Sequence, residues 1–152
     1  MGRDRTVERV ERDWRSLLAT IDAVPEGALL DAGAVGEWSV RDLLTHIATW
    51  EREFLKALTV ILAGERLPHY STLYGGIDAF NAREQAAARG LSTAQARRAL
   101  VETHAELLRT LRGLPLQAPR AEERLRRRLR QDTSHHYAEH ARQVEAWWQQ
   151  VR

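Results

Sequence analysis

The sequence predicts an all-α protein: a four-helix bundle with a helical insertion between the second and third long helices. In four long segments, apolar residues recur at spacings of three and four, the pattern of a helix with one buried face. The connections are short and carry glycine and proline, and no useful length of chain alternates apolar and polar residues as a strand does. With 152 residues, the chain is expected to form one domain, residues 1–152.

The first helix is expected over roughly residues 5–23. Its apolar stripe consists of Val7, Val10, Trp14, Leu17, Leu18 and Ile21. Pro25 and Gly27 follow this stripe and are expected to end the helix. A loose stretch over residues 26–37 should then lead to the second helix, with glycines at its turns.

The second helix is predicted to begin at the capping box Ser39-Val40-Arg41-Asp42, in which the Ser39 hydroxyl caps the first turn. Its stripe consists of Leu43, His46, Ile47, Trp50, Phe54, Ala57, Leu58 and Ile61. The helix should end near Ala63, with Gly64 at its C-terminal cap. His46 therefore lies on the apolar stripe and not on the solvent face.

The insertion is expected to contain an irregular loop and one helix. Residues 64–76 include one proline and two glycines and are expected to form the loop. Residues 77–89 have helical composition, and Gly90 should stop that helix.

The third long helix is predicted to open at a second capping box, Ser92-Thr93-Ala94-Gln95. Its stripe consists of Ala96, Leu100, His104, Leu107, Leu108 and Leu111. Gly113 and Pro115 are expected to close it, and Pro119 is expected in the connection that follows.

The last helix is expected to run without a break from about residue 121 to residue 151. Its stripe consists of Leu125, Leu129, Thr133, His136, His140, Val144, Trp147 and Val151. His136 and His140 thus take core-facing positions on a long helix.

Composition restricts the chemistry that this chain can support. The sequence has no cysteine, so disulfides, thiolate ligands and a protein thiol nucleophile are excluded. Any thiol must come from outside the protein, and any metal must be held by His, Asp, Glu or water. The net charge is only +2, so nucleic acid is not expected as a partner. No apolar run approaches about 18 residues, and no signal-peptide pattern opens the chain, so a cytoplasmic protein is expected.

His136 and His140 form the clearest candidate for a binding site. Two imidazoles four residues apart on a helix lie on one face, and both can reach a divalent ion. His46, which also faces the core from another long helix, is the candidate third ligand. Three neutral imidazoles with open positions form a catalytic type of site. The alternative for each is a core histidine with a hydrogen bond to a backbone carbonyl.

Other residues are candidates for lining a pocket beside this site: Trp50, His69, Tyr70 and His104. Trp50 lies one turn after His46 and either walls the metal cavity or, as we favour, belongs to the core. His104 faces the interior, where a pocket position and a hydrogen-bonded core position are both open. His69 lies in the loop with Tyr70, where pocket lining and plain exposure are equally open.

Three further groups near the C-terminus are given structural roles. Glu139 points off the stripe and is expected to be solvated or to support a ligand, and His135 is expected at the rim. Trp147 and Trp148 are expected to pack or to form a dimer contact. The arginine-rich run consists of Arg124, Arg126, Arg127, Arg128 and Arg130. These arginines spread around the helix, so we expect a solvated face paired with Glu122, Glu123 and Asp132.

Several of these segments together resemble the DinB-like (DinB/YfiT) family of metal-binding four-helix bundles. The similar segments are Gly36-Glu37-Trp38-Ser39-Val40-Arg41-Asp42-Leu43-Leu44-Thr45-His46-Ile47 with Trp50-Glu51, then Ile77-Asp78-Ala79-Phe80-Asn81-Ala82, and Asp132-Thr133 through His140. The resemblance implies a metal triad of His46, His136 and His140 at one end of the bundle, and often a homodimer.

The middle segment, residues 77–82, looks closest to the ClbS/DfsB-like branch, which is linked to self-protection against a DNA-alkylating product. Other members of the family are thiol-dependent S-transferases or isomerases that use mycothiol, bacillithiol or glutathione, and many have no known activity. The resemblance therefore supports the triad but does not fix the reaction.

The function expected from these observations is that of a metal-dependent enzyme. A divalent ion (Zn, Ni or Fe) held by His46, His136 and His140 would activate water or a low-molecular-weight thiol against a small electrophile, in an S-transferase or hydrolase reaction. One alternative is a non-enzymatic small-molecule binding or self-protection protein with the same cavity. Another is a structural helical dimer. The triad requires its three nitrogens to converge within roughly 4 Å of a common point.

Overall fold

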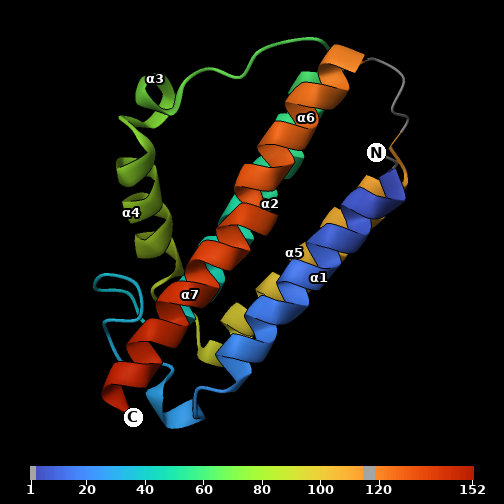
Figure 1. Cartoon of the computed structure of the whole chain (residues 1–152). Coiled ribbons are helices and arrows are strands. Elements are labelled where there is room, and N and C mark those ends of the chain that lie inside the picture. The colour runs from blue at the N-terminus through green and yellow to red at the C-terminus, as the bar shows by residue number, and fades with distance from the viewer. Residues whose placement is uncertain (1–2, 115–118) are drawn as a thin grey trace.

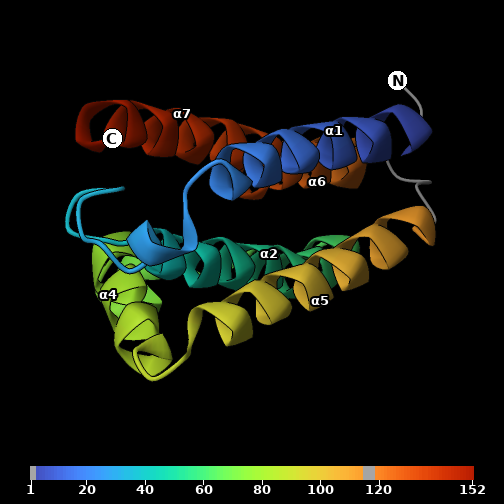
Figure 2. The same ribbon diagram turned by 90° about the horizontal axis from the view of Figure 1, so that it is seen from below.

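Four helical arms form a bundle in the computed structural model, which describes residues 3–114 and 119–152. The arms are α1 (Arg3–Asp22), α2 (Val40–Leu62), α5 (Thr93–Arg112) and the consecutive pair α6 (Pro119–Asp132) and α7 (Ser134–Val151). Helix α1 packs against α5 and α7, while α2 packs against α5 and α6. Figure 2 shows the resulting two layers, with α1, α6 and α7 in one and α2 and α5 in the other. The predicted all-α bundle is confirmed.

The insertion lies between α2 and α5 and contains α3 (Tyr70–Tyr74) and α4 (Ile77–Ala88). Helix α4 packs against α2 on the outside of the bundle (Figure 1). Residues 64–76 were expected to form only a loop, and α3 corrects that prediction. Within the described residues there is no strand, only an isolated bridge between Val35 and Trp38.

The core runs along the length of the bundle and contains the predicted stripes. Every arm contributes fully or almost fully buried side chains, among them Leu17, Ile21, Leu43, Phe54, Leu100, Leu107, Leu129 and Val144. Burying such side chains contributes about 1.5–3 kcal/mol each, so these stripes supply most of the driving force for folding. Val151, the last residue of the predicted stripe, is 55% exposed and lies outside the core.

Both predicted capping boxes are present. The Ser39 hydroxyl accepts from the Asp42 amide at 3.2 Å, and the Asp42 carboxylate accepts from the Ser39 amide at 3.0 Å. Ser92 and Gln95 make the same reciprocal pair at the start of α5. Gly64 follows α2 with φ of +75°, the left-handed conformation that glycine adopts at helix ends.

The last arm is not the single unbroken helix that the apolar stripe predicted. Thr133 separates α6 from α7 with φ of −129° and ψ of −97°. Its hydroxyl donates to the Leu129 carbonyl at 2.6 Å, the same carbonyl that its amide contacts at 2.9 Å. Such back-bonding by threonine competes with the regular helix ladder and bends helices. The apolar stripe continues across the break because a distortion at one residue hardly changes the direction in which the following side chains point.

The start of this arm also differs from the prediction. Pro119 opens α6 and does not lie in the preceding connection. Proline is favourable in the first turn of a helix, where its missing N–H costs nothing. Pro115, expected to help close α5, lies outside the described residues. Within the described residues, no helix is long and apolar enough to cross a membrane.

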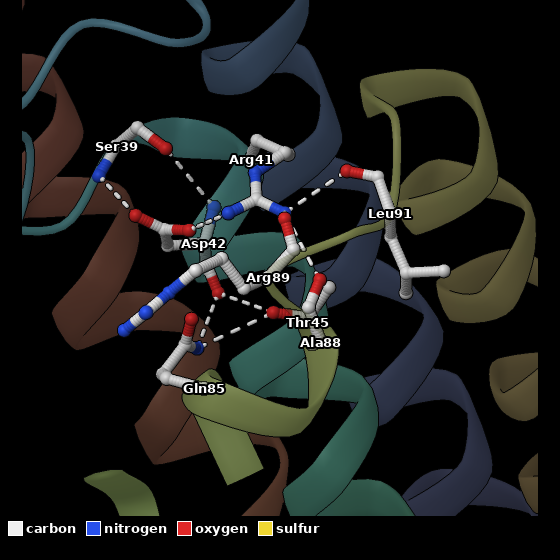
Figure 3. A network of polar contacts seen from close by, with 8 residues as sticks. All are labelled: Ser39, Arg41, Asp42, Thr45, Gln85, Ala88, Arg89 and Leu91. Carbon is white, nitrogen blue, oxygen red and sulfur yellow. Dashed lines mark hydrogen bonds and ion pairs between the residues drawn. The ribbon is translucent and has the colours of Figure 1, made fainter.

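Arg41 fastens the insertion to the bundle. Its Nη1 donates to the carbonyls of Ala88 at 3.1 Å and Leu91 at 2.9 Å, just where α4 ends (Figure 3). Its Nη2 forms an ion pair with Asp42 in the first turn of α2. Gln85 of α4 adds a bond from its amide nitrogen to the Asp42 carbonyl at 2.7 Å. These contacts fix the end of α4 beside the start of α2.

Replacing Arg41 with methionine is expected to loosen α4 while leaving the bundle folded. The change leaves carbonyls at the end of α4 without their donor, which costs about 1–3 kcal/mol where the group is buried. Hydrogen exchange over residues 77–91 should therefore become at least about tenfold faster. Arg52→Met is the matched control, because Arg52 is exposed on α2 and donates only to Thr49. Equal exchange rates in the two variants contradict the anchoring role.

Candidate metal centre

Three histidine side chains from two helices converge at one point. His46 lies on α2, and His136 and His140 lie one turn apart on α7. The Nε2 atom of His136 is 2.9 Å from Nε2 of His46 and 2.8 Å from Nε2 of His140. One ligand atom from each ring lies within 4.8 Å of the others. The triad therefore meets the geometric requirement derived from the sequence.

The environment of the three rings suits a cation. Gln143 Oε1 accepts from Nδ1 of His140 at 2.6 Å, which leaves the Nε2 lone pair of His140 directed at the other two rings. Without a cation, a proton on Nε2 of His136 can bridge to only one of its two neighbours at a time. On a tetrahedral ion, ligand nitrogens lie about 3.3 Å apart, slightly farther than Nε2 of His136 lies from Nε2 of His46 and of His140. Small side-chain rotations therefore suffice to accommodate an ion.

All three imidazoles are held in their neutral form. Burial and the neighbouring His140 lower the pKa of His46 to about 3. Burial, reinforced by His140 and His46, places the pKa of His136 well below its usual value. Burial also lowers the pKa of His140. Neutral imidazole is the form that binds a metal ion, so no proton has to be displaced near pH 7.

Metal-free protein is expected to lose stability as the pH falls from about 7 to about 5. The unfolded chain takes up a proton on each histidine near pH 6.5, whereas the folded triad resists protonation to lower pH. The free energy of unfolding therefore decreases on acidification. Asp132 acts in the opposite direction because burial raises its pKa to about 6, but it is one group against three.

Urea unfolding of chelator-treated protein at several pH values measures this slope. A variant with His46, His136 and His140 all replaced by glutamine is the control and should show a flatter or reversed profile. A wild-type stability that stays level or increases toward pH 5 contradicts the assignment of three buried neutral imidazoles.

A pocket of about 640 Å³ opens beside the triad. It is lined by His46 and Trp50 of α2, Tyr70 of α3, Ile77 and Asn81 of α4, Arg128, Gln131 and Asp132 of α6, and His136, Glu139 and His140 of α7. The insertion thus supplies one wall and the bundle the other. Trp50 Nε1 donates to Asn81 Oδ1 at 2.9 Å, which joins the two walls.

Some of the other candidate residues line the pocket beside the triad, and others do not. Trp50 and Tyr70 line the pocket, whereas His69 lines an adjoining pocket of about 590 Å³. His104 is buried in the bundle, where its Nδ1 lies 3.0 Å from Glu51 Oε1. His135 and Glu139 are both exposed, with Glu139 at the pocket rim.

Two charged residues of the pocket were not predicted from the sequence. Arg128 was expected on a solvated face, but its side chain is only 16% exposed, and that of its partner Asp132 is 6% exposed. The Arg128 Nε–Asp132 Oδ2 distance is 2.6 Å. Arg128, Asp132, His136 and His140 follow one another at intervals of four, so the register of the histidine pair contained the signal. The neighbouring pairs Arg126–Glu122 and Arg127–Glu123 are present as expected.

A second buried polar cluster lies in the bundle core and was also missed. Glu51 is fully buried, and its Oε1 accepts from the Tyr137 hydroxyl and contacts His104. The His104 ring stacks on Trp14 with a centroid distance of 4.0 Å and an interplanar angle of 8°. Because Tyr137 adjoins His136, this cluster fixes the start of α7 against α2 and α5.

Comparison with known proteins agrees with this architecture. The family model described as the DinB superfamily matches residues 9–144, nearly the whole chain. No curated protein and no solved structure matches significantly. An all-α bundle with three histidines converging from two helices, together with a family match of this extent, identifies the chain as a member of the DinB superfamily.

Proposed function

We propose that this protein is a metal-dependent enzyme in which His46, His136 and His140 hold one divalent ion, Zn, Ni or Fe. The substrate of this enzyme is a small electrophile, and the nucleophile is water or a low-molecular-weight thiol. The observation that carries the proposal is the convergence of three neutral Nε2 atoms at the edge of a pocket large enough for a small molecule. Three histidines with open positions are the ligand set of catalytic and not of closed structural sites.

The ion would activate the nucleophile, and the pocket residues would bind and orient the substrate. A divalent ion bound by three imidazoles lowers the pKa of a water or thiol, which makes a nucleophile available at neutral pH. Trp50, Tyr70 and Ile77 offer apolar surface that binds an organic substrate and excludes water. Asn81 and Gln131 offer amide groups that orient polar substituents. Because the chain has no cysteine, the thiol in a transferase reaction is a second substrate.

Two successive measurements, first of metal content and then of turnover, test the proposal. Protein purified without a metal-affinity step should contain about one divalent ion per chain by elemental analysis. A panel of electrophiles, with and without thiols, should then show many turnovers per chain, lost on metal removal and restored on reloading. If metal-loaded protein turns over none of the panel, the result favours a small-molecule binding protein over an enzyme.

The second candidate function is a small-molecule binding or self-protection protein. The observation that favours it is that residues 77–82, which resemble the ClbS/DfsB-like branch, contribute Ile77 and Asn81 to the pocket wall. Such a protein consumes or retains one equivalent of electrophile per chain. A burst of one equivalent with no further reaction therefore separates it from an enzyme.

Self-association is a separate proposal. We propose a homodimer, as the family resemblance implies. Sedimentation equilibrium should give a mass near twice the 17.4 kDa of one chain. A monomeric mass at micromolar concentration contradicts the dimer but leaves the metal site unaffected.

A further inference from the structure

Arg128 stands at the junction of the two pockets beside the triad. It lines the pocket that contains the histidines and also the adjoining pocket that contains His69, and Tyr70 and Ile77 are the other residues common to both. A ligand that extends from the triad pocket into the adjoining pocket passes the lining that the two share, which includes this guanidinium. Its position is fixed from several sides at once.

The contacts of Arg128 hold one edge of the guanidinium and leave the other free. Nε donates to Asp132 at 2.6 Å, and Nη2 donates to the Tyr70 hydroxyl at 2.8 Å. The guanidinium carbon also lies 6.0 Å from the Trp50 ring centroid and 5.7 Å from that of Tyr70. Among the described residues, Nη1 has no hydrogen-bond partner. An arginine has five N–H donors, so Nη1 and the second hydrogen of Nη2 remain available.

This arrangement is suited to a carboxylate. Two parallel N–H groups on one edge match the two oxygens of a carboxylate, and a preorganised guanidinium loses little entropy when it binds. Charge points the same way when the triad is loaded, because a divalent ion and Arg128 together outweigh Asp132 and the rim residue Glu139. Glu53, which accepts from the Tyr70 hydroxyl at 2.9 Å, is balanced by Lys56, whose Nζ lies 2.9 Å from Glu53 Oε1.

We propose that Arg128 anchors a carboxylate of the small molecule whose reactive end lies at the triad, so that the substrates include a small organic acid. This inference rests on the proposed function for the location of the reactive end, but not for the recognition of the acid. The carboxylate belongs either to the thiol or to the electrophile. A purely structural role for Arg128, tying α3 to the bundle through Tyr70, is the competing account.

Two pairs of nearly isosteric probes separate the sources. The thiol pair is 3-mercaptopropionate and 3-mercaptopropan-1-ol, and the electrophile pair is acrylate and acrylamide. Dissociation constants are measured by ligand-observed NMR on zinc-loaded protein and, for the electrophile pair, also on zinc-free protein. In at least one pair, the acid should bind about tenfold or more tightly than its neutral partner, and that pair identifies the source.

Arg128→Met should remove this preference, while Arg127→Met should retain it because Arg127 is 67% exposed and pairs only with Glu123. Circular dichroism verifies that each variant is folded. If Arg128→Met does not fold, Arg128→Lys serves instead, and its preference should fall below about threefold because lysine lacks the two-donor edge.

The outcomes distinguish this inference from the proposed function. Equal binding of acid and neutral probe by wild type, or an acid preference that survives in Arg128→Met, overturns the anchoring role. A protein that takes up no zinc but prefers acrylate through Arg128 contradicts the metal site and supports the carboxylate site. Zinc uptake without any acid preference supports the metal site and contradicts the carboxylate site.

Discussion

The His136→Ala variant is expected to bind a divalent ion on the order of a thousandfold more weakly than wild type. Loss of a residue that merely supports a ligand costs about 10- to 100-fold in affinity, and loss of a ligand costs more. His136 is the central member of the triad, because its Nε2 lies within 2.9 Å of Nε2 in both other rings. A competition titration of Zn²⁺ against a chromophoric chelator measures the change.

His135→Ala is the matched control for this variant. His135 is the adjacent residue on α7, but its side chain is exposed and it does not belong to the triad. Its zinc affinity should equal that of wild type. If His136→Ala retains wild-type affinity, any bound ion lies elsewhere on the chain and the triad assignment is wrong.

Glu51→Ala is expected to lower the free energy of unfolding of the metal-free protein by about 3–5 kcal/mol, the sum of lost hydrogen bonds and a cavity. Glu51 is fully buried and is the shared partner of the Tyr137 hydroxyl and His104 Nδ1. Its removal takes away the acceptor that these two groups share and leaves them only their longer contact with each other, at 3.3 Å, and it also leaves a cavity. Urea unfolding followed by circular dichroism measures the loss.

Glu51→Gln keeps the shape of the side chain and one acceptor oxygen, so its loss should be smaller, about 1–2 kcal/mol. A double-mutant cycle of Glu51→Gln with Tyr137→Phe should show coupling, because the two residues share one hydrogen bond. A Glu51→Ala loss below about 0.5 kcal/mol, typical of surface substitutions, contradicts the role of this cluster in stability.

Helical periodicity explains why much of the fold and the triad could be predicted. Spacing along a helix determines which residues share a face, so His46, His136 and His140 could be assigned to the interior before any packing was known. The capping box at Ser39 is equally local, since its two hydrogen bonds join residues three apart. Such features depend only on the conformation of a single segment.

Features that depend on packing between segments could not be predicted in this way. Arg128 is covered because Tyr70 of the insertion lies against it, and periodicity within α6 contains no information about α3. The break at Thr133 was invisible because a distortion of one residue hardly disturbs the apolar stripe. Glu51 is buried because Tyr137 and His104, from two other helices, supply its partners.

The central claim is that three imidazoles bind one divalent ion, and anomalous diffraction tests it most directly. Crystals of tag-free protein loaded with zinc should show one strong anomalous peak at the zinc edge, about 2.0–2.1 Å from Nε2 of His46, His136 and His140. In His136→Ala crystals, loaded with no more zinc than saturates wild type, the same peak should be absent. A loaded crystal with no peak at the triad, or with its strongest peak elsewhere on the chain, contradicts the account.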